Sequence, residues 1–313
     1  MKVGNHRKST LIATLATAAL LLAACAEDDG NGNGNDSGNG DTGGQVLAGE
    51  EITIAMFAGW DEGIAATYLW KAAFESQGAT VNVELADVEP VYDGVASGTW
   101  DIGFDAWLPI THEPYWEQHP ELVDLGVWYD QALLTIAVNE DAPIQSLTEL
   151  ADAADQFGNR IVGIDAGAGL TRITQEEVIP TYGLEDMDFI ISSTQAMLTE
   201  LETAVNAGEN IVVTLWQPHW AYDEFPIRNL EDPEGTLGDA EEIHAFARPG
   251  FEEDFPEAAD WVSNWTFSAE QLFELENVIF NENEAQDEAG YEAAVQQWLD
   301  ANPGYLEQIT GGA

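Results

Sequence analysis

The stretch Glu51–Ser76 reads EITIAMFAGWDEGIAATYLWKAAFES and indicates a strand followed by a helix. Glu51–Ala58 is rich in residues that favour strands and ends at Gly59, whereas Ile64–Ser76 has apolar residues at helical spacing. The same alternation of strand and helix continues for most of the chain. Since such alternation is typical of parallel sheets with helical crossovers, we expect an α/β fold.

The alternation comes in two successive sets, which predicts two lobes. The remaining strands of the first set are expected at Thr80–Leu85, Ile102–Ala106 and Leu133–Val138, with helices at Val91–Ser97 and Ser146–Ala154. The second set has strands at Ile161–Ile164, Phe189–Ser192 and Ile211–Leu215, with helices after Gly169 and at Ala196–Ala207. From Pro256 onward the pattern is helical. We predict one lobe from residues 49–140 plus 244–313 and a second from 141–243.

The charge balance excludes two classes of partner. The chain has 58 Asp+Glu against 8 Lys+Arg and a formal net charge of −50. No basic face is available for nucleic acid or for anionic lipid headgroups. With 45% hydrophobic residues and 11 Trp, the chain can still bury a large core. Strong self-repulsion at low salt, screened over only about 3 Å at 1 M, predicts a protein adapted to concentrated salt.

The N-terminus has the pattern of an export signal. Residues 1–9 are polar and basic, and residues 10–24 form an apolar run that is shorter than the roughly 20 residues of a membrane-spanning helix. Leu22-Ala23-Ala24-Cys25 resembles the bacterial lipoprotein signal, in which the cysteine is lipidated and becomes the new N-terminus. We therefore predict a signal peptide at 1–24, a lipid anchor on Cys25 and a flexible Gly/Asn/Asp linker at 25–48. The alternative is a secreted protein with an incidental cysteine.

Catalytic motifs are scarce. No serine lies in a G-x-S-x-G elbow, there is no G-x-x-x-x-G-K-[ST] loop, and Cys25 is the only cysteine. His112-Glu113 and His119 do not have the H-E-x-x-H spacing of a zinc site. Pairs of carboxylates carry little information in a chain with 58 acids. We expect no enzyme activity, no cofactor and no metal.

Three tryptophans follow predicted strands: Trp60, Trp107 and Trp216. In parallel α/β folds ligands bind at the carboxyl ends of strands, so these three rings are expected to face a cleft. The alternative for each ring is plain packing, which we assign to Trp70, Trp100, Trp116, Trp128, Trp220, Trp261, Trp265 and Trp298.

A fourth strand end leads into a glycine-containing turn, Asp165–Thr171, before a predicted helix. Free N–H groups at a helix start suit an anion, here a carboxylate. The turn is not a dinucleotide fingerprint, because Arg172 replaces the third glycine, and a tight structural turn is the alternative. Aromatic rings suit a quaternary ammonium group, since each cation–π contact contributes about 0.5–2 kcal/mol. The combination indicates a small zwitterion with a soft cation and a carboxylate.

Five blocks carry a family resemblance: GWDEGIAATYLW, DAWLPITH, GIDAGAGL, SSTQAMLTEL and VTLWQPHW. In this order they resemble the glycine-betaine-binding lipoproteins of osmoprotectant ABC importers, over nearly all of residues 50–305. The resemblance implies a two-lobed type II periplasmic-binding-protein fold with a hinge and an interlobe cleft. It implies a cation cage of Trp60, Trp107 and Trp216, and carboxylate contacts from His112 and from the backbone amides of Gly169 and Leu170. Ala166 stands where the family commonly has proline.

The expected function is an extracytoplasmic receptor, anchored through Cys25, that delivers glycine betaine or proline betaine to a membrane permease driven by a cytoplasmic ATPase. His219 is expected to be structural. A choline or carnitine receptor of the same fold is the alternative. Choline lacks a carboxylate, so loss of His112 would matter little for it.

Overall fold

The computed structural model describes residues 45–311 of the 313-residue chain. The predicted signal peptide, Cys25 and most of the predicted linker lie outside the described residues. Within the described range, the helices are all too short or too polar to cross a membrane.

The first lobe is built on a mixed sheet with the strand order β2-β1-β3-β9-β4. Strands β1 (Glu51–Phe57), β2 (Thr80–Ala86) and β3 (Ile102–Leu108) are parallel, whereas β9 (Glu241–Ala247) runs antiparallel to β3 and to β4 (Val123–Asn139). The sheet is therefore mixed rather than parallel throughout, because β9 and the first half of β4 enter it in the opposite sense.

The second lobe is built on strands β4, β7 (Val212–Gln217), β5 (Arg160–Val162) and β6 (Asp188–Ile190), in that order. A short strand, β8 (Ile227–Asn229), also pairs with β4. Strands β5, β6 and β7 are parallel to one another, and β4 is antiparallel to β7. The α/β class and the two predicted sets of strands are thus confirmed.

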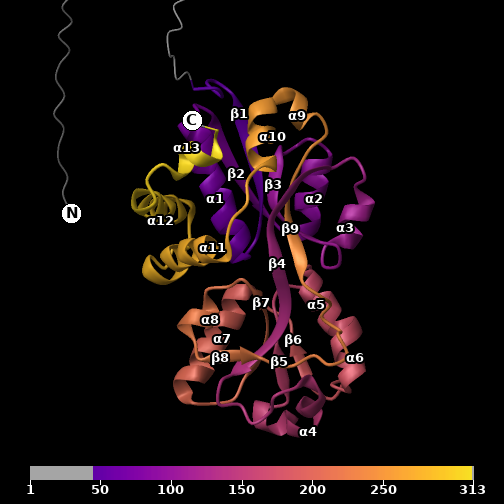
Figure 1. The fold of residues 1–313 in the computed structure, drawn as a ribbon. Coiled ribbons are helices and arrows are strands. Elements are labelled where there is room, and N and C mark those ends of the chain that lie inside the picture. Colours follow the sequence, from indigo (N-terminus) through magenta and orange to yellow (C-terminus); the bar gives the residue numbers. More distant parts are fainter. Residues whose placement is uncertain (1–44, 312–313) are drawn as a thin grey trace, which may run out of the picture. The chain divides into compact units, whose positions relative to one another are not determined.

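Strand β4 is shared by both lobes, and Figure 1 shows it running from one to the other. Its first part pairs with β9 up to Ala132, and from Leu133 onward it pairs with β7. The chain returns to the first lobe between β8 and β9. These two connections join the lobes. The boundaries predicted at 140/141 and 243/244 stay a prediction.

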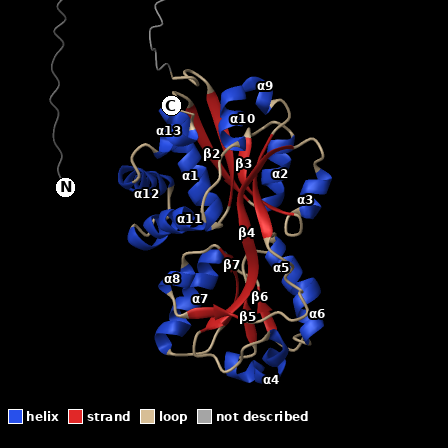
Figure 2. Ribbon diagram, in the orientation of Figure 1, coloured by secondary structure: helices blue, strands red, loops and turns tan. Residues whose placement is uncertain are grey.

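Helices lie on both sides of each sheet (Figure 2). In the first lobe they are α1 (Asp61–Ser76), α2 (Val88–Ala96), α3 (Glu113–Gln118), α9 (Phe251–Asp254), α10 (Pro256–Ser263), α11 (Ala269–Glu276), α12 (Glu288–Ala301) and α13 (Tyr305–Ile309). In the second they are α4 (Leu150–Ala153), α5 (Gly169–Ile173), α6 (Ile179–Tyr182), α7 (Thr194–Ala207) and α8 (Ala221–Glu224). A turn of π-helix at Thr174–Val178 joins α5 to α6, and another at Asn277–Glu282 follows α11.

Helix α1 is the central helix of the first lobe and packs against α11, α12 and α13. Its side chains are buried on nearly all sides, and the Trp70 ring lies parallel to that of Phe104 at 5.8 Å. Trp265 meets Trp70 edge-on and stacks on Trp128. This aromatic core fixes α1 against β3, and so fixes the residues at the start of α1 against the end of β3.

Candidate functional site

The carboxyl ends of the parallel strands of both lobes meet at one cavity, with about 290 Å³ of space not filled by protein atoms. Its lining is mostly apolar, as is typical of small-molecule sites. The lining residues are Trp60, Glu62, Trp107, Thr111, His112, Leu134, Ile164, Ala168, Gly169, Leu170 and Trp216. All six residues predicted for ligand binding are therefore brought together here, and their roles as ligand contacts remain a prediction.

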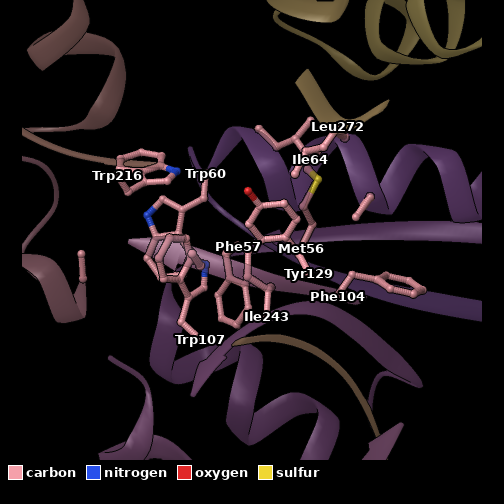
Figure 3. Close-up of a cluster of buried hydrophobic side chains, with 14 of the residues drawn as sticks. Met56, Phe57, Trp60, Ile64, Phe104, Trp107, Tyr129, Trp216, Ile243 and Leu272 are labelled. Carbon is pink, nitrogen blue, oxygen red and sulfur yellow. The ribbon is translucent and has the colours of Figure 1, made fainter. Parts of the chain in front are cut away.

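The three tryptophans reach the cavity from different elements, and Figure 3 shows their side chains grouped together. Trp60 is the residue before α1, Trp107 lies in β3, and Trp216 lies in β7 of the second lobe. All three are at least 95% buried. Each of Trp107 and Trp216 is followed, after one residue, by a proline in a cis peptide bond. The rings of both lobes thus line one cavity.

His112 lies beside Trp60, with the two rings stacked at 5.1 Å and inclined by 15°. The Trp107 backbone N–H donates a hydrogen bond of 3.0 Å to His112 Nδ1, so the neutral ring carries its own hydrogen on Nε2. Burial, together with the positive charge of Arg172, lowers the pKa of His112 to about 3. His112 is therefore a neutral side chain with an N–H donor available at the cavity wall.

The loop before His112 is held by a buried carboxylate. Glu241 in β9 accepts hydrogen bonds from the backbone N–H of Ile110 at 2.7 Å and of Thr111 at 2.8 Å, and from the Thr111 hydroxyl. From the second lobe, the Arg172 guanidinium donates to the carbonyl oxygens of Ile110 and Thr111. This loop is consequently fixed by its own lobe and contacted by the other.

Helix α5 begins at the cavity with Gly169 and Leu170. The first N–H groups of a helix have no partner within it, and they carry partial positive charge. A side chain on Gly169 would overlap the Thr111 carbonyl across the interlobe contact, so only glycine permits this approach. The start of α5 and the neutral His112 ring thus place hydrogen-bond donors at the wall of the same cavity.

Glu62 was missed by the sequence analysis. It lies in the first turn of α1, lines the cavity, and accepts hydrogen bonds from the indole N–H of Trp107 at 3.2 Å and of Trp216 at 2.8 Å. It thereby joins the tryptophans of the two lobes. A second bond of this kind runs from the indole N–H of Trp220, which was assigned to packing, to Asp61 at 2.6 Å.

The cavity residues Thr111, Leu134, Ile164 and Ala168 were also missed. Leu134 lies on β4 opposite Trp216, so its place in the cavity follows from strand register rather than from a motif. Ile164 directly precedes the turn Asp165–Thr171 that was singled out as an anion site, and Ala168 lies within it. The acidic pair after Trp60 was visible in the sequence but could not be distinguished among 58 acids.

Comparison with known proteins gives consistent results. Residues 50–301 match the OpuAC family, the substrate-binding domain of the ABC-type glycine betaine transport system. The glycine betaine/carnitine transport binding protein GbuC of Listeria monocytogenes is 37% identical over 163 residues. That match covers 51% of this chain and 52% of GbuC, so it spans about half the length of this relative.

Two solved structures share the fold. A glycine betaine/L-proline-binding protein, ProX from Borrelia burgdorferi, is 28% identical and superposes with a TM-score of 0.75 over 83% of this chain and 100% of its own. Lactococcal OpuAC in its closed form with glycine betaine has 24% identity and a TM-score of 0.75, over 83% and 99%. The two-lobed periplasmic-binding-protein fold is thus confirmed. Because the family match covers most of its length, the chain belongs to the OpuAC family of glycine betaine transport substrate-binding domains.

Proposed function

We propose that this protein captures a small quaternary ammonium zwitterion, glycine betaine or proline betaine, and delivers it unchanged to an ABC permease. The observation that carries the proposal is the cavity itself, where Trp60, Trp107 and Trp216 from two lobes meet the N–H donors of His112 and the start of α5. One side of this cavity suits a soft cation and the other suits a carboxylate.

The rings supply a large share of the expected binding energy. Three cation–π contacts contribute about 2–6 kcal/mol in total. A micromolar dissociation constant corresponds to about 8 kcal/mol. A quaternary ammonium group has no N–H to satisfy, whereas a primary ammonium would leave its donors unpaired against the rings. The site therefore favours betaines over ordinary amino acids.

The carboxylate is proposed to accept hydrogen bonds from His112 Nε2–H and from the backbone N–H groups of Gly169 and Leu170. His112 is suited to this role, because its Nδ1 is already engaged by the Trp107 N–H and its ring is neutral. The partial charge at the start of α5 adds to the attraction. All three donors are uncharged groups, so their short-range hydrogen bonds to the carboxylate are little weakened by high salt.

Ligand contacts to both lobes would favour the closed arrangement. Besides the Trp216–Glu62 bond, the Tyr115 hydroxyl donates to the Gly167 carbonyl oxygen across the lobes at 3.0 Å. We assign residues 49–140 with 244–313 to one lobe and 141–243 to the other, with β4 from Leu133 onward extending into the sheet of the second lobe and Glu241–Ile243 of β9 into that of the first. The closed form is the one that the permease is proposed to receive.

The setting follows from the sequence predictions. A lipid on Cys25 and the linker at 25–48 would hold the receptor at the outer face of the cell membrane, and the partner is a permease with a cytoplasmic ATPase. Binding by rings and neutral donors suits concentrated salt, where long-range attraction is screened. Replacing Cys25 by Ser should release the protein from the membrane fraction, and retention would contradict the anchor.

Carnitine is the second candidate, since the name of GbuC includes it. Carnitine also combines a trimethylammonium group with a carboxylate, but on a longer chain. Choline shares only the cation. The distance between the tryptophan rings and the N–H donors decides whether glycine betaine, carnitine or choline fits the cavity best.

The test is a titration of residues 49–313 in molar salt with glycine betaine, proline betaine, carnitine, choline and glycine, followed by tryptophan fluorescence and calorimetry. We expect saturable binding of the betaines and none of glycine. Choline alone would support the cage and contradict the carboxylate contacts. No binding of any of the five would contradict the proposed ligand class.

A further inference from the structure

Four carboxyl groups lie buried directly behind the cage. Asp61 and Glu62 begin α1, Asp105 lies in β3, and Glu276 ends α11. Their exposed fractions are 6%, 1%, 1% and 0%. Burying even one unpaired carboxylate is costly, so four in one place call for a compensating partner.

Lysine and arginine do not supply that partner within residues 45–311, where neither forms an ion pair with any of the four groups. His219 Nε2 lies 3.5 Å from Asp61, but burial lowers the pKa of His219 to about 3, so this ring is neutral. The compensation comes from indole N–H groups. Trp220 donates to Asp61, and Trp107 donates to Asp105 at 2.9 Å as well as to Glu62.

Part of the cluster is poorly hydrogen-bonded. One buried oxygen of Asp105 has no partner among the described residues, and the backbone N–H of Trp220 approaches Glu276 without forming a bond of good geometry to either of its oxygens. Asp61 and Asp105 act on the charge of Glu276, and Asp105 and Glu276 act on that of Glu62. The four groups therefore share one electrostatic environment that is short of positive charge.

Glu62 is the member of this cluster that reaches the cavity. One of its oxygens accepts from a tryptophan of the first lobe and the other from a tryptophan of the second. Since Trp107 and Trp216 are two of the three cage rings, a cation held by the rings would lie beside this carboxyl group. Its charge would then be balanced by the ligand.

We propose that Glu62 forms an anionic floor to the cage, and that binding of a permanently cationic ligand expels a proton from the Asp61–Glu62–Asp105–Glu276 carboxyl cluster. This inference rests on the proposed function, and it adds to it a specificity-determining residue and a proton linkage. Binding by the tryptophan rings alone would involve neither an acidic specificity residue nor the release of a proton.

The direction of the linkage follows from the surroundings. Burial, then the charges of Asp105 and Glu276, raise the pKa of Glu62 well above its usual range. Burial raises the pKa of Asp61 and of Asp105 to about 7. Without ligand, the cluster therefore holds protons near neutral pH. A fixed positive charge beside Glu62 favours the ionised form, so a proton leaves.

Other titratable groups around the cluster do not reverse this sign. His112 and His219 stay neutral, because burial lowers the pKa of each to about 3. Tyr92 and Tyr129, which feel the charges of Asp105 and Glu276, have raised pKa values and stay protonated, burial being the main cause. The positive charge of Arg172, which acts on His112, is present throughout. Proton exchange near pH 7 should therefore come from the carboxyl cluster.

The first test is calorimetry of glycine betaine binding at pH 7, in molar salt, in buffers with different ionisation enthalpies. Neither charged group of the ligand titrates between pH 6 and 8, so any proton comes from the protein. We expect the release of about half to one proton per ligand, and an affinity that rises by about tenfold to a hundredfold from pH 6 to 8. Binding without proton exchange at any pH from 6 to 8 would overturn the inference.

Glu62→Gln tests the residue itself, with Glu202→Gln on the exposed side of α7 as a control of equal charge change. We expect Glu62→Gln to lose at least half of the proton release and Glu202→Gln to keep all of it. If Glu62→Gln does not fold, the number of protons that the wild type releases on binding, and its dependence on pH, still test the proton linkage. Equal proton release in both variants would contradict the assignment to Glu62.

A neutral ligand separates charge from shape. In 3,3-dimethylbutanoate a carbon atom replaces the nitrogen of glycine betaine, so the shape is kept and the positive charge is lost. We expect the wild type to prefer glycine betaine strongly and Glu62→Gln to reduce this preference by about tenfold or more. An unchanged preference would refute the anionic floor. If the wild type binds no betaine at all, the proposed function fails instead.

Discussion

Replacing Trp216 with alanine should weaken glycine betaine binding more than any change outside the cavity. Trp216 is the cage ring of the second lobe, is 3% exposed, and donates its indole N–H to Glu62 at 2.8 Å. Its loss removes one dry cation–π contact of about 2 kcal/mol. It also removes a bond between the lobes, which contributes about 1 kcal/mol.

Together these losses amount to about 3 kcal/mol, or roughly a hundredfold rise in the dissociation constant. Trp216→Phe keeps a ring face but loses the N–H, and should cost about tenfold. Trp261→Ala, on the half-buried surface of α10, is the matched control and should bind like the wild type.

The assay is isothermal titration calorimetry in molar salt, with unfolding curves to show that each variant is folded. The order wild type, Trp216→Phe, Trp216→Ala is expected for the affinity. If folded Trp216→Ala binds within twofold of the wild type, the ring takes no part in the site and the cage assignment is refuted.

Four further results are expected. His112→Ala should weaken the binding of glycine betaine at least tenfold and leave the binding of choline nearly unchanged. The difference in affinity between wild type and His112→Ala should show no step near pH 6.5, because the lowered pKa of His112 keeps its ring neutral. Calorimetry at pH 5.5 and 8 checks both expectations, and equal losses for the two ligands would contradict the carboxylate contact. Gly169→Ala should hinder closure against Thr111 and weaken binding while unfolding stays close to that of the wild type, so unchanged affinity would count against this interlobe contact. Without ligand, the protein should lose stability as the pH rises from 5 to 8, because burial raises the pKa of Asp61 and Asp105 from 3.8 to about 7 and the folded state therefore binds more protons than the unfolded state in this window. Each of the two groups should lower the free energy of unfolding by about 2–3 kcal/mol. Denaturant unfolding at both pH values measures this loss, and higher stability at pH 8 would contradict it. The melting temperature should rise from low salt to molar NaCl, since screening relieves the net charge of −50, and a constant value would refute the adaptation to salt.

Much of the fold was predictable because several of its strands are nearly uninterrupted apolar runs. Leu133–Val138 and Ile211–Leu215 were both expected, and both lie in the sheet of the second lobe. The two cage tryptophans in β3 and β7 were recognisable for the same reason, as a large ring at the end of a buried strand has a cleft in front of it.

Strand β9 was missed because its sequence, EEIHAFA, mixes apolar residues with Glu241 and His244. Both side chains are buried, and their partners lie more than a hundred residues away: Thr111 for Glu241, and Asp124 for His244. The first half of β4 was missed because bulges near Gly126 and Tyr129 break its alternation. No local pattern encodes such pairings.

Glu62 shows the corresponding limit for the site. Its role depends on two indole groups, 45 and 154 residues away in sequence, that converge on one carboxyl group only when both lobes are in place. The tryptophans could be selected by residue type and position, whereas this acid could not. Tertiary structure supplies that information.

The most direct test of the central claim is a crystal structure of residues 49–313 with glycine betaine. The account predicts the trimethylammonium group among Trp60, Trp107 and Trp216, and the carboxylate within hydrogen-bond distance of His112 Nε2 and of the amide nitrogens of Gly169 and Leu170. A ligand bound outside this cavity, or bound in it with the carboxylate toward the rings, would contradict the account.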